Sequence, residues 1–189
     1  GLRNLIDDQI NNQGMPRQVD ERPFKVGRNL AVTEGQVVFR NAVCEIIQYR
    51  PLTEDVHEKP VLIIPPQINK YYVVDLARGK SLVRNLLDQG VQTFCISWRN
   101  PTRRHRDWGM ETYVSAARDA VEAVQDITGA DSVNLMAVCV GGITASILAG
   151  HLFAAGEEAR VASLSLMVTT LDTQSESLLG LFAGKDSIE

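Results

Sequence analysis

The chain has 189 residues, of which 44% are hydrophobic and 22% charged, an ordinary composition for a soluble globular domain with one sizeable core. Its formal charge of −4, from 19 basic and 23 acidic residues, gives no reason to expect nucleic acid or an anionic membrane as a partner. No apolar stretch is long enough to cross a bilayer, and the first residues lack the pattern of a signal peptide. Because the chain also lacks an initiator methionine, we expect it to be part of a longer, cytoplasmic protein.

Residues 1–35 are mostly polar, and we interpret them as a separate N-terminal segment with one short helix near residues 2–10. Two short strands are predicted next, at residues 37–39 and 44–49. The second of these mixes β-branched and aromatic side chains with polar ones, as a partly exposed strand does. Residues 36–189 are therefore expected to belong to one larger domain.

Four apolar runs of strand length follow, and none of them alternates with polar residues. Such runs are typical of strands that are covered on both faces, as in a parallel sheet. They are residues 60–66 (PVLIIPP), 93–98 (TFCISW), 132–137 (SVNLMA) and, in large part, 161–168 (VASLSLMV). Helical patterns lie between them at residues 81–87, 113–127 and 142–155, with Gly129 as the expected C-terminal cap of the second. This alternation predicts a doubly wound α/β sheet.

The three cysteines of the chain form neither a CxxC pair nor a disulfide framework, so reduced thiols are the simpler interpretation. Cys44 and Cys95 lie inside predicted strands, where cysteine is usually a small buried hydrophobic residue. Cys139 differs because Gly141 and Gly142 follow it, and burial alone would not require two glycines there.

Cys139 is expected to occupy a nucleophile elbow, a tight turn between a strand and a helix that presents a reactive side chain. Such a turn needs small residues two positions before and after the nucleophile. Ala137 and Gly141 occupy these positions, although glycine is usual at the first. A helix N-terminus favours the thiolate form of a cysteine. The N–H of Val140 and one N–H from residues 65–69 are the expected donors to an oxyanion.

The partners that a hydrolase-type triad needs are not evident in the sequence. His151 is the one histidine after Cys139, but it lies about three turns into the following helix and should point away from the elbow. His57 and His105 precede Cys139 and lie in polar loops. Asp172 follows the last predicted strand and is a candidate acid, although a capping or turn role is favoured.

Three segments together resemble polyhydroxyalkanoate (PHA) synthases: residues 65–72 (PPQINKYY), 97–101 (SWRNP) and 138–142 (VCVGG). The resemblance extends over about residues 14–173, and residues 15–24 (MPRQVDERPF) are similar to the pseudomonad type that uses medium-chain hydroxyacyl groups. It implies an α/β-hydrolase-like, mostly parallel sheet with a nucleophile elbow, truncated after about the sixth strand. Residues 36–189 would then be the N-terminal part of an incomplete catalytic domain.

The resemblance implies an acyltransferase that polymerises (R)-3-hydroxyacyl-CoA into PHA and releases CoA, with Cys139 as the covalent nucleophile. It places the oxyanion-hole amides at Ile68 and Val140, and the triad Asp and His beyond residue 189, so the chain alone is expected to be inactive. No metal or cofactor is implied, because the substrate itself carries coenzyme A. Related synthases are generally dimers at the surface of cytoplasmic PHA granules.

Two other functions stay open at this point. One is a lipase-like hydrolase or PHA depolymerase with a cysteine nucleophile. The other is a non-catalytic scaffold or granule-binding domain.

Two weaker features of the sequence have two interpretations each. Tyr71 and Tyr72 either line an acyl channel or pack in the core. A basic loop after the second apolar run either meets CoA phosphates or is simply solvated, which is favoured. It contains Arg99, Arg103, Arg104, His105 and Arg106.

Overall fold

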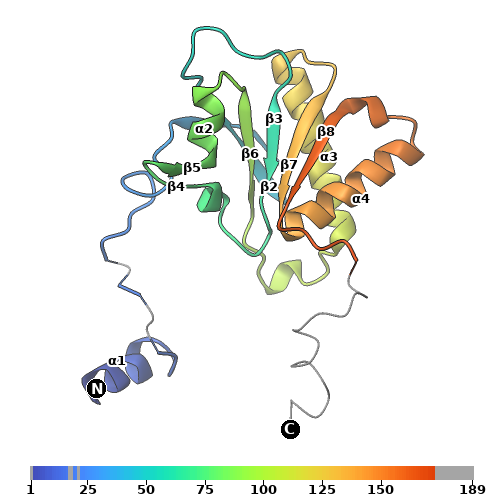
Figure 1. The fold of residues 1–189 in the computed structure, drawn as a ribbon. Helices are drawn as coiled ribbons and strands as arrows, with labels where there is room; N and C mark the ends of the chain where they lie inside the picture. Colours follow the sequence, from blue (N-terminus) through green and yellow to red (C-terminus); the bar gives the residue numbers. More distant parts are fainter. Residues whose placement is uncertain (1, 17–18, 21, 173–189) are drawn as a thin grey trace.

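The structure is a computed structural model that describes residues 2–16, 19–20 and 22–172. Its centre is a six-stranded sheet in the order β1-β2-β6-β3-β7-β8 (Figure 1). β1 and β2 run antiparallel to their neighbours, whereas β6, β3, β7 and β8 are parallel, so the predicted mostly parallel sheet is confirmed. The strands are β1 (Gly35–Arg40), β2 (Cys44–Tyr49), β3 (Val61–Ile64), β6 (Thr93–Trp98), β7 (Val133–Val138) and β8 (Val161–Met167).

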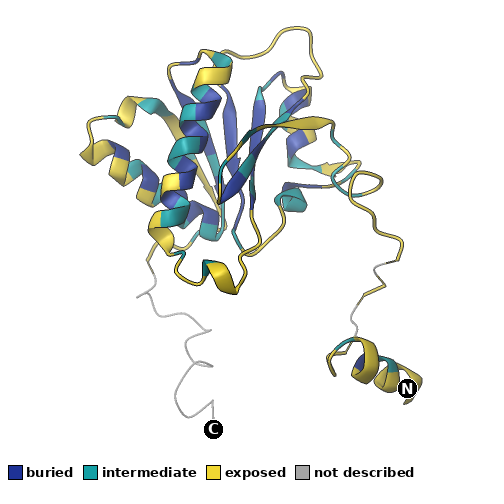
Figure 2. Ribbon diagram, turned by 180° about the vertical axis from the view of Figure 1, so that it is seen from behind, coloured by how far each residue is buried: buried dark blue, intermediate teal, exposed yellow. Residues whose placement is uncertain are grey.

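Helices cover both faces of this sheet, as Figures 1 and 2 show. One face carries α2 and the other carries α3 and α4. Two separate clusters of buried side chains agree with these layers. Leu62 and Ile64 of β3 belong to the cluster beneath α3 and α4, whereas Ile63 belongs to the one beneath α2. Because both faces of β3 are covered, its sequence is an uninterrupted apolar run. The helices are α2 (Leu82–Asp88), α3 (Met110–Thr128) and α4 (Val140–Ala154).

Local chemistry sets the ends of the covering helices. The Oγ of Ser81, just before α2, accepts a hydrogen bond from the backbone N–H of Arg84 at 2.9 Å, which satisfies one unpaired donor of the first turn. α3 ends at Gly129, whose φ of 69° lies in the left-handed region that glycine adopts without strain. The predicted cap of this helix is confirmed.

The remaining elements are short. The predicted N-terminal helix is present as α1 (Leu2–Asn11), which lies apart from the sheet in Figure 1. A hairpin and three 3₁₀ turns were not predicted, because they are too short to show a hydrophobic period. They are β4 (Asp75–Ala77), β5 (Lys80–Ser81), η1 (Tyr71–Val74), η2 (Arg103–His105) and η3 (Glu158–Arg160). None of the helices in the described part of the chain combines the length and apolar character that a bilayer crossing requires.

β8 is more exposed than its sequence predicted. Its apolar run indicated a strand covered on both faces, yet Leu166 and Met167 are 38% and 40% exposed. Within the described residues β8 pairs with β7 alone, so it forms an edge of the sheet. The prediction that both faces of β8 are covered was therefore wrong. The sequence of a strand shows that it is apolar, but whether its faces are buried depends on which other elements pack against them.

Candidate active site

Cys139 occupies the turn between β7 and α4, with φ 53° and ψ −123°. A non-glycine residue seldom adopts a positive φ, because its Cβ then crowds the backbone, so surrounding contacts must hold it there. The N–H of Cys139 donates to the carbonyl of Met167 at 2.9 Å, and the N–H of Gly142 donates to the carbonyl of Cys139 at 2.8 Å. The structure thus places Cys139, which is half-buried, on a strained strand-to-helix turn.

Close packing explains the two glycines after Cys139. A Cβ at Gly141 would collide with the backbone carbonyl oxygens of Ile64 and Pro65, and a Cβ at Gly142 would collide with the side chain of Thr169. The first turn of α4 therefore lies directly against the end of β3. Sequence spacing indicated the need for small residues here, and the structure identifies what they must avoid.

The loop after β3, residues 65–70, lies beside this turn. Trp98 at the end of β6 donates from Nε1 to the carbonyl of Pro65 at 2.7 Å, and the N–H of Asn69 donates to the carbonyl of Pro66 at 3.1 Å. Ile68 is 80% exposed within this loop. Val140 begins α4, and the first N–H groups of a helix have no partner within it. The two predicted oxyanion donors thus come from adjoining segments at the carboxyl edge of the sheet.

A partly buried hydrogen bond that the sequence did not predict ties this loop to α4. The Nε2 of Gln67 donates to the Oγ1 of Thr144 at 2.7 Å, and Thr144 is fully buried. The Thr144 hydroxyl lies 3.3 Å from the carbonyl of Val140, to which it donates. Among the described residues, the Oε1 of Gln67 is buried and has no partner. The one available signal was a threonine near the start of the predicted helix at residues 142–155.

The other two cysteines are buried in the core, as predicted. Burial raises the pKa of Cys44 to about 12, and the carboxylates of Asp119 and Glu45 add to the effect. Burial also raises the pKa of Cys95, with a smaller contribution from Asp75. Both therefore stay protonated and inert near neutral pH.

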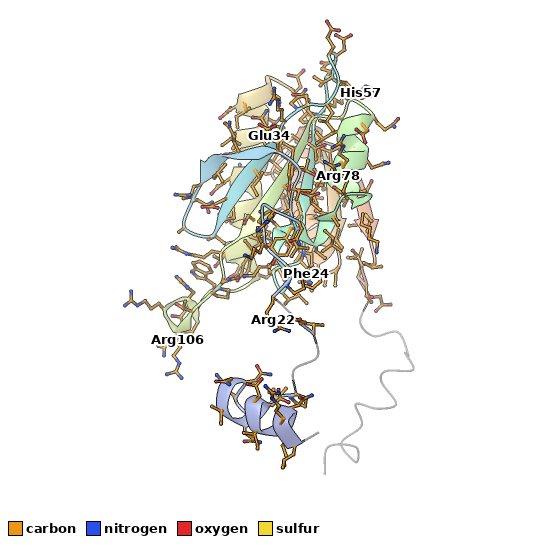
Figure 3. All side chains as sticks on the ribbon, turned by 90° about the vertical axis from the view of Figure 1, so that its left-hand side faces the viewer. Arg22, Phe24, Glu34, His57, Arg78 and Arg106 are labelled. Atoms are coloured by element: carbon orange, nitrogen blue, oxygen red, sulfur yellow. The ribbon has the colours of Figure 1, made fainter. Side chains whose placement is uncertain are left out.

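Two of the histidines lie away from Cys139. The N–H of His57 donates to the carbonyl of Gly90, which precedes β6, so His57 lies at the amino end of the parallel strands. Figure 3 shows His57 and Arg106, which follows β6, near opposite ends of the sheet. His151 is exposed in the last turn of α4, about three turns from Cys139. Neither supplies a base to the turn.

His105 lies at the carboxyl edge, where it is part of a different arrangement. Its Nδ1 accepts a hydrogen bond from the N–H of Thr102 at 2.9 Å, and its ring stacks on Trp108 with centroids 4.2 Å apart. Trp108 meets Tyr113 edge to face, and Tyr113 meets Trp98 in the same way. This chain of aromatic contacts, called the aromatic ladder below, anchors the turn that contains His105 to the core.

The other candidates have no clear catalytic geometry. Tyr71 packs against the cluster beneath α2 and meets Tyr72 edge to face, with ring centroids 5.4 Å apart, so packing accounts for Tyr71. Asp172 is exposed just beyond β8. Among the residues that the structure describes, no group of three His, Cys, Asp or Glu side chains is arranged to hold a metal ion.

Comparisons with known proteins agree with this geometry. A family model described as the α/β hydrolase fold matches residues 60–185, and one described as the N-terminus of poly-beta-hydroxybutyrate polymerase (PhaC) matches residues 1–86. A solved α/β hydrolase from the metagenome of Lake Arreo, Spain, is similar with a TM-score of 0.57 at 21% identity, covering 96% of this chain and 63% of that one.

Curated relatives match along the whole chain. It is 50% identical over 189 residues to poly(3-hydroxyalkanoate) polymerase 1 of Ectopseudomonas oleovorans, covering 34% of that protein. It is 42% identical over 190 residues to the poly(3-hydroxyalkanoate) polymerase subunit PhaC of Cupriavidus necator, covering 32% of it. The chain thus spans about a third of the length of these relatives. It belongs to the α/β-hydrolase fold family, and along its whole length it is similar to poly(3-hydroxyalkanoate) polymerases.

Proposed function

We propose that this chain carries the nucleophile of an acyltransferase that polymerises (R)-3-hydroxyacyl-CoA into PHA and releases CoA. The observation that carries the proposal is the backbone of Cys139, whose φ of 53° holds it on the turn between β7 and α4. A structural cysteine has no need of this strained conformation, which is typical of residues that must present a reactive side chain. The similarity of all 189 residues to part of named poly(3-hydroxyalkanoate) polymerases supports the substrate class.

In the proposed reaction, the thiolate of Cys139 attacks the carbonyl carbon of the acyl-CoA thioester. Negative charge develops on the carbonyl oxygen, where the N–H groups of Val140 and Ile68 stabilise it. The bond between the carbonyl carbon and the CoA sulfur then breaks, CoA leaves as a thiolate that takes up a proton, and the acyl group stays on the cysteine as a new thioester. The activation of the substrate is therefore retained.

The second half of the reaction makes the polymer. The hydroxyl of another acyl unit loses its proton to a general base and attacks the enzyme-bound thioester, which yields an oxoester and regenerates the thiolate. A serine in place of Cys139 would lose the thioester activation in the first step. We propose that the base and the acid that orients it lie outside this sequence, so that these 189 residues are inactive alone. The proposal also includes a homodimer at the surface of cytoplasmic PHA granules.

The test is CoA release and polymer formation by the full-length protein, with (R)-3-hydroxyacyl-CoA as substrate. Cys139→Ala is expected to reduce both by more than about 1,000-fold, as removal of a covalent nucleophile does. Cys95→Ala serves as the matched control, because it removes a buried thiol that has no role in the proposed chemistry. Mass spectrometry of the wild-type protein should find the acyl group on the peptide that contains Cys139.

Two outcomes would contradict the proposal. Polymer formation that survives Cys139→Ala would assign the chain a non-catalytic role. Release of free hydroxy acid without polymer would instead indicate a hydrolase.

A further inference from the structure

A polar pocket lies at the same edge of the sheet as Cys139, and the strands β3 and β6 separate the two. Strand register places it there: Met136 of β7 is opposite Ile63 of β3, which is opposite Cys95 of β6. Cys139 and Trp98 each lie three residues further along parallel strands, and Trp98 pairs with Cys44 at the start of β2. The β1–β2 turn therefore reaches the same edge of the sheet as Cys139.

This pocket has a volume of about 410 Å³ and lies between the β1–β2 turn and the end of β6. Two arginines in its lining are held by neighbours: Arg40 forms an ion pair with Glu45 at 2.6 Å, and Arg99 donates to the carbonyl of Ala42 at 3.0 Å. Ser97 also belongs to the lining. Guanidinium groups that are already oriented suit phosphate oxygens, because little conformational entropy is lost when they bind.

The turn that follows β6 adds positive charge beside the pocket. Figure 3 shows Arg106 projecting from this turn into solvent, where it makes a 3.7 Å ion pair with Asp107. Arg103 and Arg104 are exposed and have no ion pair within the described residues. The aromatic ladder from His105 to Trp98 holds the turn in place. Residues 40–45 and 97–107 carry five arginines and two carboxylates, although the chain as a whole is negative at −4.

We propose that this pocket and turn bind the phosphate-bearing nucleotide end of the CoA thioester, a role that rests on the function proposed above for Cys139. The length of the substrate fits the spacing. Cys139 follows β7 and Cys44 begins β2, three strands away, so they are about 14 Å apart at ~4.8 Å per strand. The pantetheine arm between the sulfur and the first phosphate is about as long as four residues of extended chain, roughly 14 Å.

Substrates that share one acyl group but differ at the far end test this subsite in the full-length protein. The acyl group is presented on CoA, on dephospho-CoA and on pantetheine, which carries no phosphate. The wild-type KM should rise along this series, and the KM for acyl-CoA should rise with salt because screening weakens contacts with the phosphates. Arg103→Ala/Arg104→Ala should raise the KM for acyl-CoA about 10-fold or more and leave that for acyl-pantetheine unchanged.

Arg84→Ala, an exposed arginine of α2 in an ion pair with Asp88, is the matched control and should change no KM. Calorimetric binding of CoA itself to a Cys139→Ala protein should weaken by the same factor in the double variant, with pantetheine as the reference probe. Equal wild-type KM values for acyl-CoA and acyl-pantetheine would overturn the subsite and leave the role of Cys139 intact. Absence of any Cys139-dependent release from all three substrates would overturn both.

Discussion

Replacing Gly141 by alanine tests whether the turn at Cys139 depends on close backbone packing. The added Cβ would collide with the carbonyl oxygen of Ile64 and lie 2.8 Å from that of Pro65. Both are backbone atoms at the end of β3, which is held on either side by β6 and β7. They cannot yield as a flexible side chain would, so either α4 or the sheet must shift.

The expected loss of stability follows from two opposing terms. Overpacking in a rigid site costs about 3 kcal/mol at the upper end of the usual range. Alanine regains at most about 1 kcal/mol over glycine within a helix. Gly141→Ala should therefore destabilise the chain by about 2 kcal/mol, which lowers Tm by about 4–8 °C for a protein of this size.

Urea and thermal unfolding of the 189-residue chain, followed by circular dichroism, measure this loss. Gly150→Ala is the matched control because it lies on the same helix, is exposed, and has no atom within 4 Å of an added Cβ. It should stabilise the chain by about 0.5–1 kcal/mol. If Gly141→Ala is as stable as the wild type, the packing explanation of the turn is wrong.

Two further predictions concern the thiols and the partly buried hydrogen bond between Gln67 and Thr144. Iodoacetamide near pH 7.5 should modify Cys139 first, because burial and a raised pKa keep Cys44 and Cys95 protonated and inaccessible in the folded chain. Peptide mass mapping measures the rate at each cysteine, and similar rates at all three would refute this. In the full-length protein, Thr144→Val should lower kcat about 10-fold with little change in KM, because the bond from Gln67 that positions the oxyanion loop is lost. Thr144→Ser keeps the hydroxyl and should restore kcat, whereas an equal loss in both variants would indicate a packing role alone.

Much of the fold is visible in the sequence because the determining interactions are local. The runs at residues 93–98 and 132–137 became β6 and β7 within one residue, since their apolar composition and length already limit them to buried strands. The end of α3 at Gly129 could also be predicted, because it depends only on the ability of this glycine to adopt a positive φ. The β4–β5 hairpin was missed because its formation depends on surrounding structure more than on its short sequence.

The sequence by itself determined that a cysteine would lie between a buried strand and a helix with glycines after it, because strand, turn and helix signals are all contained in about a dozen neighbouring residues. Only the tertiary structure decided that Gln67 would reach Thr144 and that Trp98 would hold Pro65. It also decided that Arg40, at the β1–β2 turn, and Arg99, after β6, would line one pocket level with Cys139. The two hydrogen bonds join residues that are more than 30 positions apart, and all of these arrangements depend on the order and register of strands that sequence periodicity does not specify.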